Sequence, residues 1–148
     1  DDPLVGHDMI DPLVAAFSNQ DTQLALLAKR IDKTEEICSL DIVKIVFDQA
    51  GRALYFSRSP IPFERNSGAV FYKHIGPYCW RRDFLLEFFS WQQTPLEKAE
   101  SLEMLRVLEK GHSIKCVPVE RDTIEIDTPR DIEVLEKYLA LNGDSVVR

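Results

Sequence analysis

The spacing of hydrophobic residues changes several times along the chain, and each spacing predicts one kind of element. Apolar residues three or four positions apart predict helices, and they occur over residues 8–18, 82–89, 95–110 and 128–139, with one helical turn at 34–38. Short apolar or β-branched runs bounded by turn residues predict strands, and they occupy residues 24–28, 43–47, 53–58, 70–81 and 113–119. Alternating strands and helices predict an α/β layer fold in one domain over 1–142, with a flexible tail at 143–148.

Turn and cap residues sharpen these boundaries. The turn from Asp48 to Gly51 predicts that the strands on either side of it form a hairpin. Thr94 followed by Pro95 predicts the start of a long helix, and Gly111 predicts its end. The residues expected to face inward on this helix and on the last one are Leu96, Ala99, Leu102, Leu105, Leu108, Ile132, Leu135, Tyr138 and Leu139.

Composition and charge narrow the class of protein. Apolar residues make up 45% of the chain and charged residues 29%, as in a folded globular domain. The net charge of -7, without a long run of Lys or Arg, argues against a nucleic-acid partner. No apolar stretch approaches the length of a membrane span, so we expect no membrane partner. Three widely spaced cysteines without a CxxC pair predict buried, reduced thiols in a cytoplasmic protein: Cys38, Cys79 and Cys116.

Two acidic segments are candidates for a metal site. Asp1 stands two residues before Pro3, where the alternative is a polar turn ahead of a helix. Asp127 stands before Thr128, and Thr128 with Asp131 already forms a box-like helix cap, which leaves Asp127 available. Because Mg²⁺ takes one or two protein carboxylates together with waters and phosphates, the two remote aspartates could form a Mg²⁺ site. Spacing alone leaves the simpler turn and cap interpretations open.

Further polar residues suggest a site for a sugar acid. Arg58 lies where a strand breaks and Arg65 follows seven residues later, which suits a carboxylate clamp, although surface arginines are commoner. His74 and Tyr78 could bind sugar hydroxyls, although a lone histidine is more often structural. No Ser/His/Asp or Cys/His constellation supports nucleophilic catalysis. Three glutamates at intervals of three form either a solvated face or acceptors for sugar hydroxyls: Glu97, Glu100 and Glu103.

The order of these segments resembles the 3-deoxy-manno-octulosonate cytidylyltransferases, the CMP-Kdo synthetase family. The likeness runs from residue 1 to about residue 139 and is most specific over 43–62. The motifs that carry it are, in order, Asp-Asp-Pro-Leu, Val-Lys-Ile-Val-Phe-Asp-Gln-Ala-Gly-Arg-Ala-Leu-Tyr-Phe-Ser-Arg-Ser-Pro-Ile-Pro, His-Ile-Gly-Pro-Tyr, Pro-Leu-Glu, Leu-Glu-Met-Leu-Arg-Val-Leu-Glu-Lys-Gly and Ile-Asp-Thr-Pro-Arg-Asp. The resemblance implies a Rossmann-like nucleotidyltransferase fold with three layers, of the nucleotide-diphospho-sugar transferase type, with the N-terminal strands absent.

The resemblance also implies a reaction and a set of site residues. The anomeric hydroxyl of Kdo would attack the α-phosphate of CTP, giving CMP-Kdo for lipopolysaccharide and releasing pyrophosphate. Asp1 and Asp127 would be the catalytic residues that hold Mg²⁺, and the protein would be a homodimer. The residues implied on the sugar-acid side are Arg58, Arg65, His74, Tyr78, Glu97 and Glu100.

Departures from the family pattern add two alternatives. Asp2 stands where the family usually has Glu, and Met104 stands where it usually has Gln. A thioether cannot replace an amide that both donates and accepts hydrogen bonds, so a cytidylyltransferase for a different sugar acid is one alternative. The N-terminal segment that would grip the triphosphate is not in this sequence, so we expect the 148-residue chain alone to be inactive. The other alternative is therefore an inactive fragment that acts as a dimerisation or binding module.

Overall fold

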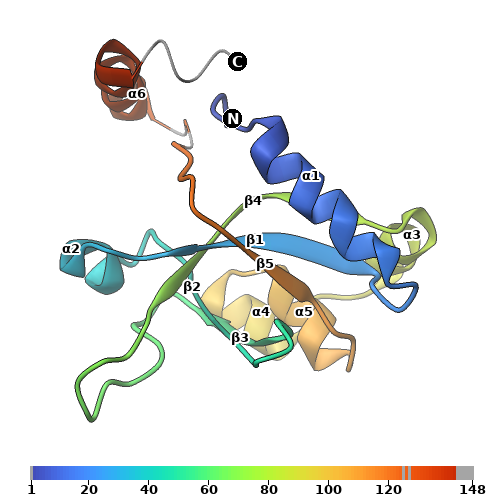
Figure 1. Cartoon of the computed structure of the whole chain (residues 1–148). Helices are drawn as coiled ribbons and strands as arrows, with labels where there is room; N and C mark the ends of the chain where they lie inside the picture. The colour runs from blue at the N-terminus through green and yellow to red at the C-terminus, as the bar shows by residue number, and fades with distance from the viewer. Residues whose placement is uncertain (1, 125, 127, 143–148) are drawn as a thin grey trace.

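A five-stranded mixed sheet with the order β3-β2-β4-β1-β5 lies at the centre of the computed structural model (Figure 1). The structure describes residues 2–124, 126 and 128–142, so Asp1, Asp127 and the predicted tail at 143–148 lie outside the described residues. The strands are β1 (Leu24–Arg30), β2 (Lys44–Phe47), β3 (Ala53–Ser57), β4 (Tyr72–Trp80) and β5 (Lys115–Val119). β5 runs parallel to β1, and the other neighbouring strands are antiparallel.

Helices cover both faces of this sheet. They are α1 (His7–Ala15), which continues into the 3-10 turn η1 (Ala16–Ser18), α2 (Thr34–Cys38), α3 (Arg82–Ser90), α4 (Pro95–Glu100), α5 (Met104–Glu109) and α6 (Pro129–Asn142). Figure 1 shows α1 on one face of the sheet and α4 with α5 on the opposite face. The last helix, α6, stands apart from the sheet on the side where the N-terminus lies.

β1 contributes to two hydrophobic cores because its successive side chains point to opposite faces. Leu24, Leu26 and Ala28 join the larger core with residues of α3 and α5, whereas Ala25 and Leu27 join a smaller core under α1. All five side chains are fully buried, which explains why this strand is a continuous apolar run rather than an alternating one. The predicted α/β layer fold with three layers is confirmed.

A bulge in β4 changes which of its side chains are neighbours. Opposite β1, His74 pairs with Ala28 and Tyr78 pairs with Leu26, so the register skips two residues of β4. The skipped residues include Pro77, which has no N–H to donate to the ladder. Tyr78 therefore takes the position that residue 76 would occupy in a regular strand, and its ring stacks on His74 with centroids 5.2 Å apart.

The predicted single helix over 95–110 is wrong, because the chain forms two helices that meet at Ser101. Ser101 has φ 56 and ψ 47, a left-handed conformation that ends α4. The amide of Leu102 then donates to the carbonyl of Glu97, which closes the helix end. The break also overturns two of the five positions predicted to face inward, since Leu96 and Ala99 are exposed while Leu105 is buried.

The structure corrects two further expectations. α6 forms as predicted, but Ile132 and Leu139 are exposed on it, because the helix does not pack against the sheet. The cysteines differ from one another, since Cys38 is exposed whereas Cys116 is buried. Burial raises the pKa of Cys116 to about 12. Across residues 2–124, 126 and 128–142, no helix has the length and apolar character needed to cross a membrane.

The two edge strands of the sheet meet at one corner. The turn between β2 and β3 is ordered by Asp48, whose carboxylate accepts hydrogen bonds from the amides of Ala50 and Arg52. Beyond it, the amide of Cys116 donates to the carbonyl of Gly51 at 2.7 Å, and the amide of Ala53 donates to the carbonyl of Ile114 at 2.9 Å. The hairpin therefore bonds to the start of β5, and the sheet curls on itself at this point.

Candidate functional site

A cavity of about 840 Å³ opens beside the end of β3 and the middle of β4. This volume is within the range of small-molecule sites in proteins, which is about 300–1,000 Å³. Segments that are distant from one another in the sequence supply its walls. The lining residues are Asp41, Ile42, Val43, Phe56, Arg58, Lys73, His74, Ile75, Tyr78, Ser101, Leu102, Glu103, Met104, Asp122, Thr123, Thr128 and Asp131.

Arg58 is the cation at the end of β3 that the strand pattern predicted, and the structure holds it in place. Its Nε donates to the carbonyl of Glu100 at 3.1 Å and its Nη1 donates to the carbonyl of Leu40 at 2.9 Å. Its backbone amide donates to the Glu100 carboxylate at 3.0 Å. Within the described part of the chain, no carboxylate forms an ion pair with the guanidinium. Its orientation is fixed while its positive charge stays available to an anion.

The second arginine of the predicted clamp lies elsewhere. Arg65 is exposed on the loop between β3 and β4 and is not among the residues that line the cavity. The structure therefore brings Arg58 to the cavity without Arg65. A substrate contact for Arg65 stays a prediction.

His74 and Tyr78 form an aromatic wall of the cavity together with Phe56. The His74 ring stacks on Tyr78 and meets Phe56 edge-on, with centroids 5.7 Å apart. Burial lowers the pKa of His74 to about 4, so the imidazole is neutral near pH 7. Its Nε2 atom is shielded from solvent and has no hydrogen-bond partner among the described residues. A buried polar atom without a partner carries a desolvation cost, which a ligand hydroxyl at this position would relieve.

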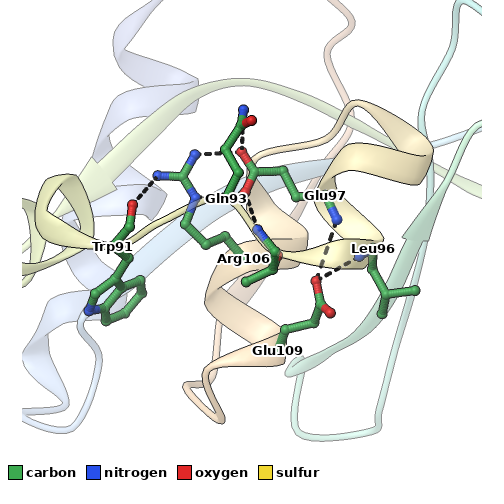
Figure 2. A network of polar contacts seen from close by, with 7 residues as sticks. Trp91, Gln93, Leu96, Glu97, Arg106 and Glu109 are labelled. Atoms are coloured by element: carbon green, nitrogen blue, oxygen red, sulfur yellow. Dashed lines mark hydrogen bonds and ion pairs between the residues drawn. The ribbon is translucent and has the colours of Figure 1, made fainter.

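Glu97 lies away from the cavity, in a buried network between α4 and α5 (Figure 2). Both of its carboxylate oxygens accept hydrogen bonds from the guanidinium of Arg106, one of them at 2.7 Å. The backbone amide of Thr94 donates to the same carboxylate at 3.2 Å. The hydrogen bonds from Arg106 hold the pKa of Glu97 below its usual range. A sugar contact for Glu97 stays a prediction, and the structure gives the side chain a different role.

The acidic residue of this region that reaches the cavity is Glu103. Glu100 instead accepts hydrogen bonds from the Ser57 hydroxyl at 2.7 Å and from the amide of Arg58, so it positions the end of β3. The break at Ser101 reorients the chain after α4, and Glu103 and Met104 line the cavity as a result. The spacing of the glutamates offered Glu103 as an acceptor for sugar hydroxyls, but the set implied by the family resemblance named only Glu97 and Glu100. The sequence signal for this part of the site was the next residue, Met104, which stands where the family usually has Gln.

Lys73 lines the cavity too, but its charge is already neutralised. Its Nζ lies 2.9 Å from a carboxylate oxygen of Glu36 and 2.7 Å from one of Asp122. Burial alone would lower the pKa of Lys73, but these two carboxylates outweigh burial and raise it. Arg58 is therefore the lining cation without an ion-pair partner in the described residues.

The predicted Mg²⁺ ligands, Asp1 and Asp127, lie outside the described residues, so the structure does not test them. The residues that it describes contain no cluster of three or more His, Cys, Asp or Glu able to hold a metal ion. The two carboxylate oxygens of Asp2 are shielded from solvent. Burial raises the pKa of Asp2 and outweighs contacts with Thr123 and the Leu4 amide, which lower it. A carboxylate in this state would be stabilised by a nearby cation.

Comparison with known proteins identifies the family of the chain. The profile of the cytidylyltransferase family matches residues 1–115, so the chain belongs to the cytidylyltransferase family. The resemblance to CMP-Kdo synthetases that the motif order predicted is confirmed by the individual relatives.

A 3-deoxy-manno-octulosonate cytidylyltransferase of Thermodesulfovibrio yellowstonii is 45% identical over 146 residues, which cover 94% of this chain and 57% of the relative. One of Fusobacterium nucleatum is 41% identical over 145 residues, covering 97% of this chain and 59% of the relative. The solved structure of a CMP:2-keto-3-deoxy-manno-octonic acid synthetase complexed with CTP matches with a TM-score of 0.88 at 33% identity, over 95% of this chain and 59% of that chain. The chain thus spans less than two thirds of the length of these relatives.

Proposed function

We propose that this chain supplies the sugar-acid side of a cytidylyltransferase that transfers CMP from CTP to Kdo and releases pyrophosphate. The proposal rests on two residues that line the same cavity. Arg58 is fixed by hydrogen bonds and has no ion-pair partner in the described residues, and His74 is neutral with an Nε2 atom that has no hydrogen-bond partner there. Kdo carries a carboxylate and several hydroxyls, which are the groups that such a pair recognises. The similarity to 3-deoxy-manno-octulosonate cytidylyltransferases supports the same substrate.

Each residue has a distinct task in this proposal. The guanidinium of Arg58 binds the Kdo carboxylate, and His74 and Tyr78 orient the sugar through its hydroxyls and its apolar face. Asp1 and Asp127 would hold Mg²⁺, since carboxylate oxygens are the protein ligands that this ion prefers. Bound Mg²⁺ would neutralise charge on the phosphates of CTP. The protein's own contribution is positioning and electrostatics, because nucleotidyl transfer asks little covalent chemistry of it.

The setting of the reaction is part of the proposal. The whole protein would act as a homodimer in the cytoplasm and supply CMP-Kdo for lipopolysaccharide. The proposal includes CTP because the solved structure of the related synthetase is complexed with CTP. Because the chain spans 57–59% of the relatives' length, we expect it to bind Kdo but not to complete the reaction alone.

Two measurements test the proposal. Isothermal titration of the 148-residue chain with Kdo should give saturable binding, whereas the C1 methyl ester of Kdo, which has no carboxylate charge, should bind at least about tenfold more weakly. Pyrophosphate release from CTP, Kdo and Mg²⁺ should be absent for this chain. Equal affinity for Kdo and its ester would refute the role of Arg58, and pyrophosphate release would show that no further segment is needed.

A second candidate substrate rests on Met104. This side chain is almost fully buried and lines the cavity at a position where the family usually has a Gln. A thioether there offers an apolar contact in place of an amide, which favours a sugar acid that is less hydroxylated at that position. Titration with a panel of sugar acids would decide, because tighter binding of another member than of Kdo would select this alternative. Binding of none of them would leave the chain as a dimerisation or binding module.

A further inference from the structure

Lys44 is a lysine without any solvent exposure, at the start of β2. Lysine is almost never fully buried unless its charge is paired. Here no carboxylate forms an ion pair with it in the described part of the chain. Instead its Nζ donates to three backbone carbonyls, those of Ser39 and Ile42 at 2.6 Å and that of Arg58. All three hydrogens of the ammonium are therefore used.

The three carbonyls belong to the two segments that flank the anion-binding part of the cavity. Ser39 and Ile42 lie on the connection between α2 and β2, whose residues 41–43 line the cavity. Leu40, on the same connection, accepts the hydrogen bond from Nη1 of Arg58. The Lys44 ammonium thus binds the backbone carbonyl of Arg58 and also the segment that orients the Arg58 guanidinium.

We propose that Lys44 is a positioning residue that acts through Arg58 to set up recognition of the substrate carboxylate. The inference rests on the proposed function, since it assumes that an anionic sugar binds at Arg58. Without the ammonium, three carbonyls would lose their donor, and the connection that carries Leu40 would separate from β3. The Arg58 guanidinium would then lose one of the two carbonyls that fix its direction.

Charge adds to the geometric effect. Burial lowers the pKa of Lys44; Cys38 and the Glu100 carboxylate oppose this, while the Arg58 cation adds to it, so the two cations lie close enough to repel each other. An anion bound at Arg58 would offset that repulsion. A buried cation behind Arg58 therefore favours negative ligands at this wall of the cavity.

A double-mutant cycle tests whether Lys44 acts through Arg58. We expect Lys44→Met to weaken Kdo binding by about tenfold, as for loss of a charge-assisted hydrogen bond. In an Arg58→Met background the same change should alter Kdo affinity by less than about twofold, because the residue through which it acts is gone. An equal loss in both backgrounds, or unchanged affinity in a folded Lys44→Met variant, would overturn the proposal.

Two matched controls separate positioning from a general loss of stability. Lys115 also donates its Nζ to a backbone carbonyl, that of Ala50, but it lies at the far corner of the sheet, so Lys115→Met should leave Kdo affinity unchanged. Leu13→Ala removes a buried side chain from the smaller core and should lower the unfolding temperature without changing Kdo affinity. If Lys44→Met does not fold, Lys44→Gln replaces it, since its amide still donates to two carbonyls.

A spectroscopic measurement decides the case even if Kdo does not bind. The Nε–H of Arg58 is hydrogen-bonded to the Glu100 carbonyl, so its ¹⁵N–¹H signal should be sharp and slow to exchange with water in the wild-type chain. We expect that signal to broaden in Lys44→Met, to broaden less in Lys44→Gln, and to stay unchanged in Lys115→Met. Failure of Kdo to bind with the signal change present would refute the proposed function alone. An unchanged Arg58 signal would refute the positioning role of Lys44.

Discussion

Two polar clusters, which include Glu97 and Glu100 of α4, differ in how their charged groups are paired. In the first, Glu97 and Arg106 pair with each other, and nearby main-chain groups and the Gln93 amide complete their hydrogen bonds. In the second, around Lys44 and Arg58, two cations are held by backbone carbonyls, and the nearby His74 has an unsatisfied Nε2.

The difference indicates which cluster stabilises the fold and which awaits a ligand. Arg106 also lies over the ring of Phe88, 4.4 Å from its centroid, so the first cluster is closed by packing as well as by charge. Buried polar groups are nearly always satisfied in native proteins, and an exception needs an explanation. In the second cluster the exception is Nε2 of His74, a residue that lines the cavity, where a substrate hydroxyl can complete it.

The largest effect is expected on breaking the closed cluster. Arg106→Met would leave the Glu97 carboxylate buried without its partner, which costs about 3–5 kcal/mol in the free energy of unfolding. Urea denaturation followed by circular dichroism measures this loss. The double variant Glu97→Gln with Arg106→Met should recover a large part of it, because the unpaired charge is gone. A loss below 1 kcal/mol for the single variant would mean that water reaches Glu97.

His74 should make stability depend on pH in the acid range. Its pKa is lowered from 6.5 to about 4, so between these values the unfolded chain binds a proton that the folded chain does not. The free energy of unfolding should therefore fall as pH falls from 6.5 to 4, by up to about 3 kcal/mol. His74→Gln should show a correspondingly smaller fall over the same window, since the carboxylates titrate alike in both. Parallel curves would mean that His74 is protonated in the folded state.

Arg58 should matter for ligand affinity rather than for stability. Arg58→Met should weaken Kdo binding by about 10- to 100-fold, the equivalent of about 1.5–3 kcal/mol for hydrogen bonds to a charged group. Arg82→Met, which removes an exposed arginine from α3, serves as the matched control and should leave affinity unchanged. Arg65→Met decides whether the second predicted arginine takes part. Equal affinity in Arg58→Met and wild type would remove the central contact of the proposed site.

The smallest effect is expected at Met104. Met104→Gln introduces an amide into the cavity wall and should tighten Kdo binding by about two- to tenfold, as expected for one neutral hydrogen bond. Titration calorimetry of both proteins with Kdo measures the change. If the natural ligand is a different sugar acid, the same substitution should weaken binding of that ligand, so the sign of the effect sharpens the choice of substrate.

Residues with local signals were predicted well. The hairpin around the Asp48 turn, the α4 start at Thr94 and the cap in which Asp131 accepts hydrogen bonds from Thr128 all follow from neighbouring residues, and all are present. The buried strand β1 followed from its continuous apolar run. Arg58 at the cavity followed from its position at a strand end.

The remaining features depend on contacts between distant residues. Nothing in the sequence around Ser101 signals a left-handed residue, since glycine is the usual choice there. The partners Glu97 and Arg106 are nine residues apart and meet only because the chain turns between them. A continuous helix would place Glu97, Glu100 and Glu103 on one side, whereas the break buries Glu97 and brings Glu103 to the cavity. The sugar contacts of Glu97 and Glu100 stay predictions.

The corner where the hairpin meets β5 has a consequence for the kinetics of folding. The hydrogen bond from Cys116 to Gly51 joins residues that are 65 positions apart, so its formation requires closure of a long loop. Contacts of such long range slow folding and lose their protection in the larger opening motions of a native protein. The amide proton of Cys116 is therefore a natural probe of sheet closure, and its rate of exchange with deuterium should follow the global unfolding of the domain.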